Sequence, residues 1–201
     1  TKTLLKNGAY TEAPLTFPSH PNHPTAMPPA YVIQTIRCSS IEHLDGFYQK
    51  IHSDPIDPQL VANLSQFGQV SPLLVWEKPC NSFQILADHA CFDAINFLGW
   101  EQVVCRVLPA TIVPYQRYAV QALHGWNALQ DSPILQAFLL QHAQQDLPDT
   151  ELLSLLNLMG HKPHLHIAEE LIALLRLADG VLLAVHRGIL AVKSAKLLRR
   201  L

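Results

Sequence analysis

The chain has 201 residues, of which 49% are apolar and 15% are charged, and its formal net charge at neutral pH is −2. This length and apolar content allow one substantial hydrophobic core or two smaller ones. The near-neutral balance excludes a chain that binds nucleic acid through its overall charge. The charged fraction lies below the quarter that is usual for soluble domains. It therefore indicates extra buried surface, such as a contact between subunits or domains.

Positive charge gathers at the carboxyl end of the chain. Residues 176–201 hold six Lys or Arg side chains against Asp179 alone, a net charge of +5, whereas residues 1–175 carry −7. A basic carboxyl end can lie beside phosphate. The same composition also suits a solvated amphipathic helix, and both interpretations stay open.

The cysteines show no Cys-x-x-Cys pair. The chain has no signal-peptide pattern, and it has no unbroken apolar run long enough to span a membrane. These features predict free thiols and a cytoplasmic protein that does not enter the membrane. The cysteines are Cys38, Cys80, Cys91 and Cys105.

The first 30 residues contain six prolines. Because proline lacks a backbone donor, residues 1–30 are predicted to form an extended arm rather than a helix or a strand.

Residues 31–110 are predicted to form a mixed α/β domain. Residues 31–38 alternate apolar and polar side chains, which is typical of a half-buried strand. A helix is expected from Asp57 or Pro58 to Phe67, with Gly68 as its carboxyl-terminal stop. The other expected elements are strands at 73–76, 83–86 and 102–108, and a helix from an N-cap at Asp88 to Gly99.

Residues 111–201 are predicted to form a separate helical domain. Helical periodicity dominates after Pro114. The expected breaks lie at residues 131–133, 146–149 and 160–163, where Pro, Gly and Asp gather.

The order of elements from Gly68 to Val107 resembles the amino-terminal domain of the ParB family of DNA-partition proteins, which shares a fold with sulfiredoxin. The resemblance is carried by Gln-Val-Ser-Pro-Leu-Leu-Val-Trp at 69–76, Phe-Gln-Ile-Leu-Ala-Asp-His-Ala at 83–90 and Asn-Phe-Leu-Gly-Trp-Glu at 96–101. It implies an α+β fold, in which a ParB/sulfiredoxin-like mixed α/β domain is followed by an all-α domain of helix-turn-helix type.

The helical half carries a second, looser part of the resemblance. Residues 150–160 are similar to the first helix of a ParB helix-turn-helix, and residues 174–198 to the segment after its recognition helix. The helix-turn-helix-like segment is therefore placed at 150–177.

The phosphate loop of the family is altered in this chain. The family's turn Gly-Glu-Arg-Arg, which implies CTP binding, aligns with Ala87, Asp88, His89 and Ala90. A triphosphate needs free amides, a close approach at glycine, and cations. The carboxylate of Asp88 is expected to cap its own helix and to compete for those amides.

The family's second nucleotide motif, Glu-Asn-x-x-Arg, aligns with residues 126–130, where only Asn127 is kept. The two losses predict a degenerate nucleotide loop without CTP hydrolysis and without a cofactor. Nucleotide binding without turnover stays open. The residues of this loop are Ala87, Asp88, His89, Ala90 and Asn127.

The resemblance implies duplex DNA as a partner, through the second helix of the helix-turn-helix. Lys162 is the only fixed cation near the start of that helix, and Glu169 and Glu170 would repel phosphate. A groove-reading helix and a purely structural helix both remain open. The candidate DNA-contacting residues are Lys162, His164, His166, Arg187, Lys193, Lys196, Arg199 and Arg200.

Other chemistry has weaker support. Sulfiredoxin needs a nucleophilic Cys in a Gly-Cys-His-Arg turn, whereas position 88 is Asp and Cys91 lacks a flanking Arg, so a small core thiol is favoured. Asp88 and Asp93 are five residues apart and hence on different sides of a helix, which is a weak signal for a nuclease or phosphoryl-transfer site. The histidines of residues 161–166 match no zinc spacing and favour an exposed turn. No catalytic residue and no metal ligand is predicted.

Three functions follow in order of preference. The first is a ParB-like DNA-binding protein of plasmid or chromosome partition or of nucleoid association, which is not an enzyme, forms a homo-oligomer and can act with a partition ATPase. The second is a catalytically inactive protein-interaction module on a ParB-type fold. The third is an enzyme that uses Asp88 and His89.

Overall fold

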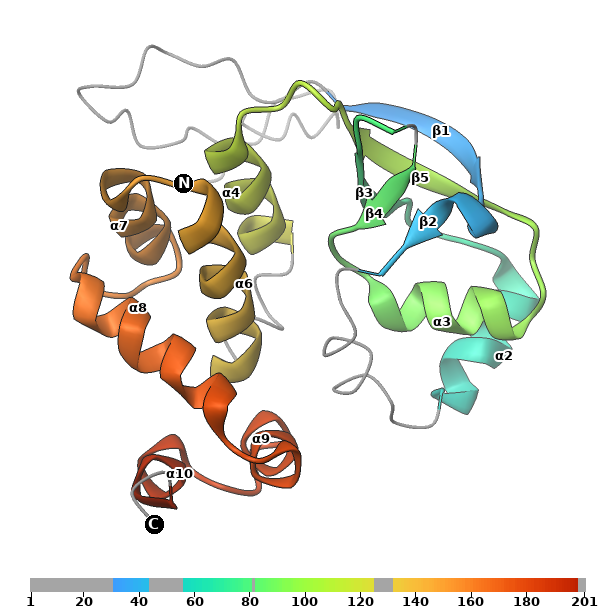
Figure 1. Cartoon of the computed structure of the whole chain (residues 1–201). Helices are drawn as coiled ribbons and strands as arrows, with labels where there is room; N and C mark the ends of the chain where they lie inside the picture. The colour runs from blue at the N-terminus through green and yellow to red at the C-terminus, as the bar shows by residue number, and fades with distance from the viewer. Residues whose placement is uncertain (1–30, 44–55, 81, 125–131, 199–201) are drawn as a thin grey trace, which may run out of the picture.

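The structure is a computed structural model that describes residues 31–43, 56–80, 82–124 and 132–198, without the side chains of Lys196 and Leu198 (Figure 1). The predicted arm at 1–30 lies outside these residues. Within them, no helix is long and apolar enough to cross a bilayer.

A five-stranded mixed sheet forms the amino-terminal half. Its strands run in the order β1-β5-β3-β4-β2. The β1–β5 and β3–β4 pairs are antiparallel, whereas β3–β5 and β2–β4 are parallel. The strands are β1 (Val32–Arg37), β2 (Ile41–Glu42), β3 (Leu73–Glu77), β4 (Phe83–Ile85) and β5 (Gln102–Leu108).

Two helices cover one face of this sheet. In α2 (Pro58–Phe67) the carboxylate of Asp57 accepts a hydrogen bond from the Gln59 amide at 2.9 Å, and proline occupies the first turn, where its missing donor costs nothing. Gly68 ends the helix at a φ of 72°, a conformation that glycine adopts readily. Figure 1 shows α2 beside α3 (His89–Phe97).

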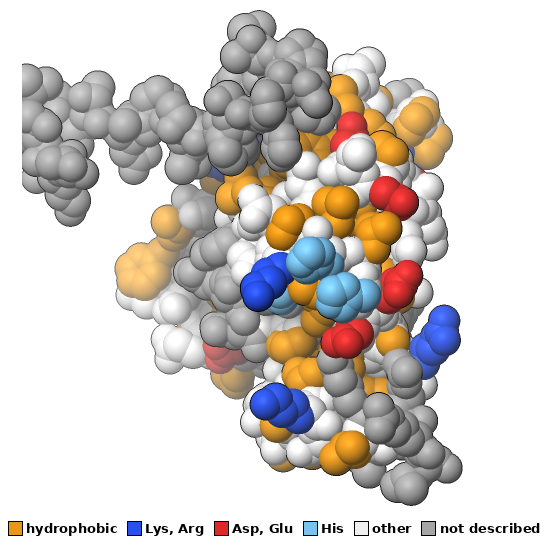
Figure 2. Space-filling model, turned by 90° about the vertical axis from the view of Figure 1, so that its left-hand side faces the viewer, with side chains coloured by type: hydrophobic (Ala, Val, Ile, Leu, Met, Phe, Trp, Pro, Cys, Tyr) orange, Lys and Arg blue, Asp and Glu red, His pale blue; other side chains and the backbone are white. Residues whose placement is uncertain are grey.

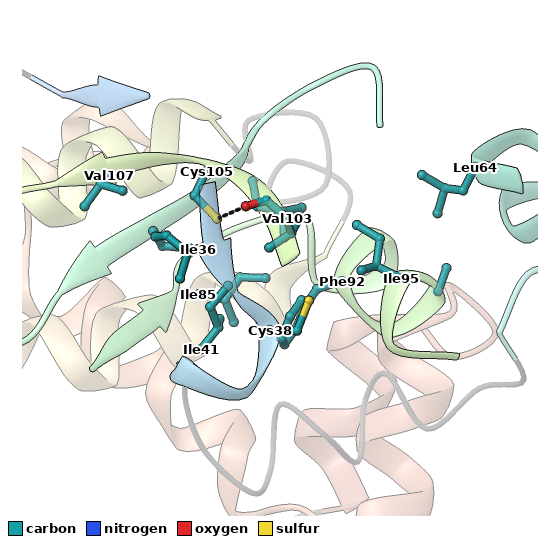
Figure 3. Packing of buried hydrophobic residues seen from close by; sticks show 13 residues of the cluster. Ile36, Cys38, Ile41, Leu64, Ile85, Phe92, Ile95, Val103, Cys105 and Val107 are labelled. Atoms are coloured by element: carbon teal, nitrogen blue, oxygen red, sulfur yellow. Dashed lines mark hydrogen bonds between the residues drawn. The ribbon is translucent and has the colours of Figure 1, made fainter. Parts of the chain in front are cut away.

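The core under these helices takes side chains from nearly every element of the domain. Figure 3 shows side chains of β1, β4, β5 and α3 meeting there. The largest fully buried members include Leu73, Ile85, Phe92 and Ile95. The alternation of Val103, Cys105 and Val107 along β5 sends every second side chain into this core.

The opposite face of the sheet packs on the helical half. Leu74, Leu86 and Leu108 form a small buried cluster, against which Ile112 and Val120 pack. Val120 belongs to α4 (Pro114–His124), so this cluster joins the sheet to the first helix of the carboxyl-terminal half.

The helical half is built around α6 (Pro133–Asp146). One side of α6 contributes Leu135, Leu139, Leu140 and Ala143 to a core shared with α4, α7 and α8, and the other side contributes Ile134 and Phe138 to a second core. The remaining helices are α7 (Asp149–Leu158), α8 (Leu165–Ile172), the 3-10 turn η2 (Ala173–Arg176), α9 (Asp179–His186) and α10 (Val192–Leu198).

The predicted fold class is confirmed, since a mixed sheet with covering helices is followed by an all-helical half. No pattern in the sequence indicated β2 or η1, the 3-10 turn at Cys38–Ser40. Two residues are too short to show an alternating pattern, and the pairing of β2 with β4 is what makes it a strand.

The side chain of Gln69, which precedes β3, forms hydrogen bonds with the backbone of β5 as a neighbouring strand would. The amide nitrogen of Gln69 donates to the Val104 carbonyl at 2.7 Å, and its oxygen accepts from the Val104 amide at 2.8 Å. The side chain therefore takes the place of one backbone residue of a neighbouring strand.

We expect Gln69→Ala to lower the free energy of unfolding by about 1 to 2 kcal/mol, because two backbone groups of β5 lose their partner. The free energy of unfolding of Gln69→Glu should lie between those of Gln69→Ala and the wild type, since a carboxylate accepts from the Val104 amide but cannot donate to its carbonyl. Urea unfolding measures both. Gln66→Ala, at an exposed position of α2, is the matched control, and an equal loss in that variant would contradict this role for Gln69.

Candidate nucleic-acid interface and nucleotide loop

The loop between β4 and α3 holds the residues that align with the family's phosphate turn. Ala87 is buried, whereas Asp88 and Ala90 are exposed. Asp88 has a φ of 65° and is the only residue other than glycine with a positive φ in the described ranges. Asp tolerates this left-handed conformation better than most residues, so the loop keeps a sharp bend without a glycine.

The carboxylate of Asp88 contacts a residue of another helix, α4. Its Oδ2 atom lies 2.8 Å from Nε2 of His124, the last residue of α4. It makes no capping hydrogen bond, so the predicted N-cap interaction is wrong. Capping requires an extended backbone at the cap residue, and the left-handed backbone of Asp88 does not provide it.

His89 is turned into the protein and is only 2% exposed. Its Nδ1 atom lies 3.4 Å from Nδ1 of His43, and the two rings stack with centroids 5.7 Å apart. One of these nitrogens must carry the proton and the other must accept it. The ring of His89 is therefore packed against His43 and is not presented at the surface of the loop.

The other side of His43 contacts an acid. Nε2 of His43 lies 3.4 Å from Oδ1 of Asp93. Burial raises the pKa of the Asp93 carboxyl, and the nearby His43 opposes this shift. The acid is thus engaged by a histidine, and the described residues contain no group of three His, Cys, Asp or Glu side chains that could hold a metal ion.

Cys91 does not have the surroundings of a nucleophile. Burial and the charge of Asp88 both raise the pKa of its thiol. A raised pKa keeps the thiol protonated at neutral pH and lowers its reactivity. This agrees with the expected core thiol and gives no support to sulfiredoxin-like chemistry.

The structure brings only part of the predicted nucleotide site together. Ala87, Asp88, His89 and Ala90 form one bend, and none of them presents a cation. Asn127 lies outside the described residues. Sequence reasoning missed His43 and His124, which are 46 and 36 residues away from their partners in the chain. No local pattern could have indicated either contact.

The second candidate site is the pair α7 and α8. Their facing sides share a buried core that includes Leu152, Leu156 and Ala168. The chain turns between them at Gly160, which has a φ of 82°. The His161 amide then donates to the Leu156 carbonyl at 3.0 Å, so the end of α7 is closed by a hydrogen bond.

The outer side of this turn and of the first turn of α8 is polar. Lys162, His164 and His166 are all exposed. The rings of His164 and His166 stack with centroids 5.5 Å apart and an interplanar angle of 21°. Figure 2 views the side of the molecule that carries α7 and α8, and shows histidines gathered beside a basic side chain with acidic side chains nearby.

His161 belongs to the same turn but faces the protein. Its Nε2 atom lies 2.9 Å from Oε1 of Gln136 on α6, so this nitrogen carries the proton and donates. Burial lowers the pKa of His161. It therefore fixes the turn to α6 and does not add charge to the outer surface.

The remaining predicted DNA contacts are dispersed. Arg187 follows α9 and Lys193 lies in the first turn of α10, and both are exposed. Figure 1 shows α9 and α10 at the far end of α8 from α7. The side chain of Lys196 and all of Arg199 and Arg200 lie outside the described residues.

No protein-family model and no curated protein sequence matches this chain. Solved structures that are similar to it include ParB proteins. One is a pNOB8-like ParB-N domain, at 15% identity and a TM-score of 0.41, with 72% of this chain covered. This chain spans about half of that one, 49% of its length.

Two more are C-terminally truncated chromosome-partitioning ParB proteins from Caulobacter crescentus. The one complexed with CTP-γ-S has 14% identity, a TM-score of 0.34, and coverage of 85% of this chain and 93% of its own. The one complexed to the centromeric parS site has 13% identity, a TM-score of 0.36, and coverage of 83% and 98%. The structures similar to this chain thus come from the family that its sequence resembles.

The bend at Asp88 yields a prediction about stability. Asp88→Asn should lose the ion pair with His124 and keep a residue that tolerates a positive φ, so the loss should stay below about 1 kcal/mol for this half-exposed pair. Asp88→Ala should lose about 1 kcal/mol more, because alanine is disfavoured in the left-handed region. Urea unfolding compares the two variants, with His124→Gln as the control for the ion pair alone. Equal stability of the Ala and Asn variants would refute the strain at this position.

Proposed function

We propose that this protein is a DNA-binding protein of the ParB type, which acts in DNA partition or nucleoid association and contacts duplex DNA through α7, the following turn and the start of α8. The observation that carries the proposal is the exposure of Lys162, His164 and His166 at the amino-terminal end of a helix whose opposite side is buried. In a helix-turn-helix, this end of the second helix enters the major groove while the first helix crosses the phosphate backbone.

The charge on α8 limits the contact to its first turn. Glu169 and Glu170 are exposed one turn later, and carboxylates there oppose the approach of phosphate. We therefore propose a shallow contact that involves few phosphates. Arg187 and Lys193 can add phosphate contacts beyond α8, since both are exposed on neighbouring elements.

We propose further that the loop at residues 87–90 does not turn over CTP. The support is that Asp88 is paired with His124, His89 is buried against His43, and Ala90 has no side-chain donor. A triphosphate at this bend would meet a carboxylate and find no cation from the loop itself.

A second candidate function is a protein-interaction module. It is favoured by large apolar side chains on the surface of the α/β half, where Phe67, Val70 and Phe97 are 67%, 86% and 68% exposed. Exposed apolar side chains of this size are typical of contact surfaces when they gather in one patch. Homo-oligomerisation and a partition ATPase remain proposals in either case.

The first candidate predicts binding to a labelled duplex at low salt, with a dissociation constant of roughly 10⁻⁴ to 10⁻⁶ M as salt approaches the physiological range. In fluorescence anisotropy, Lys162→Gln should weaken binding and reduce the slope of log K against log salt by about 1. Lys78→Gln, on the α/β half where Lys78 pairs with Glu42, is the matched control and should bind as the wild type does.

Two outcomes would contradict the proposal. One is the absence of binding at low salt in a protein whose circular dichroism shows it to be folded. The other is an equal loss of affinity in the Lys78 and Lys162 variants, which would place the contact away from α8.

A further inference from the structure

Histidine dominates the exposed surface at the start of α8. His164 and His166 stack on one another in the open, and Lys162 is the one fixed cation in the described turn before them. Histidine is the side chain whose ordinary titration falls in the physiological pH range. The charge of this surface therefore depends on pH in a way that a surface built from Lys and Arg would not.

The fixed charges on this outer surface sum to a negative value. Lys162 contributes one positive charge, and Glu169 and Glu170 contribute two negative ones. If His164 and His166 each take up a proton, the sum of these five side chains changes from −1 to +1. Protonation of the two histidines therefore reverses the sign of this sum.

The elements packed against α8 carry their own charged and titratable groups. These elements are α6, α7 and η2. On α6, the carboxylate of Asp146 is held by Arg117 and by the hydroxyl of Tyr118. The turn contributes His161, whose donor nitrogen is bound to Gln136. The other groups on these elements are His142, Asp149, Glu151 and Arg176.

His161 does not share the behaviour of its exposed neighbours. Burial lowers the pKa of His161. Its bond to Gln136 keeps the turn in place. Protonation of the outer pair can therefore change the charge of this surface while the turn stays bound to α6.

We propose that protonation of His164 and His166 gates the binding of duplex DNA at the start of α8. This inference rests on the DNA-binding function proposed above and adds its regulation by pH. The two rings repel one another once both are charged, and a phosphate oxygen beside them relieves that repulsion. DNA binding and proton uptake are therefore linked, and affinity rises as the pH falls.

The test is fluorescence anisotropy of the full chain with a labelled duplex, at about pH 8 and about pH 6 and at constant ionic strength. We expect tighter binding at the lower pH. The slope of log K against log salt should also become steeper by up to about 2, because two more cations contact phosphates.

Two double variants make the test specific. H164Q/H166Q should bind with about the same affinity at about pH 6 as at about pH 8, so that the gain on acidification is lost. H164K/H166K should bind at about pH 8 as tightly as the protonated wild type, with little change on acidification. His124→Gln removes a histidine far from α8 and should keep the full pH response.

The outcomes separate the two proposals. No binding to duplex DNA at either pH and at low salt would overturn the proposed function together with its regulation. Binding that does not change with pH, or that gains as much in H164Q/H166Q as in the wild type, would overturn the gating alone.

Discussion

The contact between β3 and α4 determines how the two halves of the chain meet. Arg117 of α4 places its guanidinium 4.2 Å from the ring centroid of Trp76 on β3, and it also pairs with Asp146 at the end of α6. The Arg117 side chain is only 12% exposed. Its partner Asp146 is 42% exposed, so the ion pair reaches the surface on the side of the acid and is partly screened by solvent.

The same contact is extended by apolar and polar neighbours. Leu74 and Leu108 of the sheet meet Ile112 and Val120. The hydroxyl of Tyr118 lies 2.6 Å from Asp146, and burial together with this carboxylate raises the pKa of Tyr118. A protonated tyrosine and a charged arginine therefore hold one carboxylate, which joins α4 to α6 while Trp76 joins α4 to the sheet.

This arrangement explains the state of the loop at residues 87–90. With α4 fixed on the sheet, its last residue, His124, reaches Asp88. Ala87 takes part in the same buried cluster as Leu74 and Leu108. Ala87 and Asp88 of this bend are therefore both engaged by other parts of the protein.

Much of the fold was predictable from local sequence. Pro58 and Gly68 fix the ends of α2 through their own backbone preferences, and the alternation along β5 fixes which of its side chains are buried. The exposed position of Lys162, His164 and His166 also follows from a turn rich in polar residues. These features depend on a few neighbouring residues, so a single sequence carries them.

The rest depends on contacts between distant residues. The pairing of Asp88 with His124 and the inward turn of His89 toward His43 join segments that no periodicity relates. The expected cap at Asp88 failed for a related reason, since its backbone conformation is set by the bend that joins β4 to α3 and not by its residue type alone. Gln69 is a third case, because its side chain forms hydrogen bonds with the backbone of Val104, 35 residues away in the chain.

The central claim is that ligand contacts lie at the start of α8 and not at the altered loop. Amide chemical shifts of the isotope-labelled chain, recorded during titration with duplex DNA and separately with CTP, test it most directly. The account predicts that DNA shifts the amides of the turn before α8 and of its first turn, and that CTP leaves residues 87–90 unchanged. Saturable CTP shifts centred on residues 87–90, with the amides around Lys162 unmoved by DNA, would contradict it.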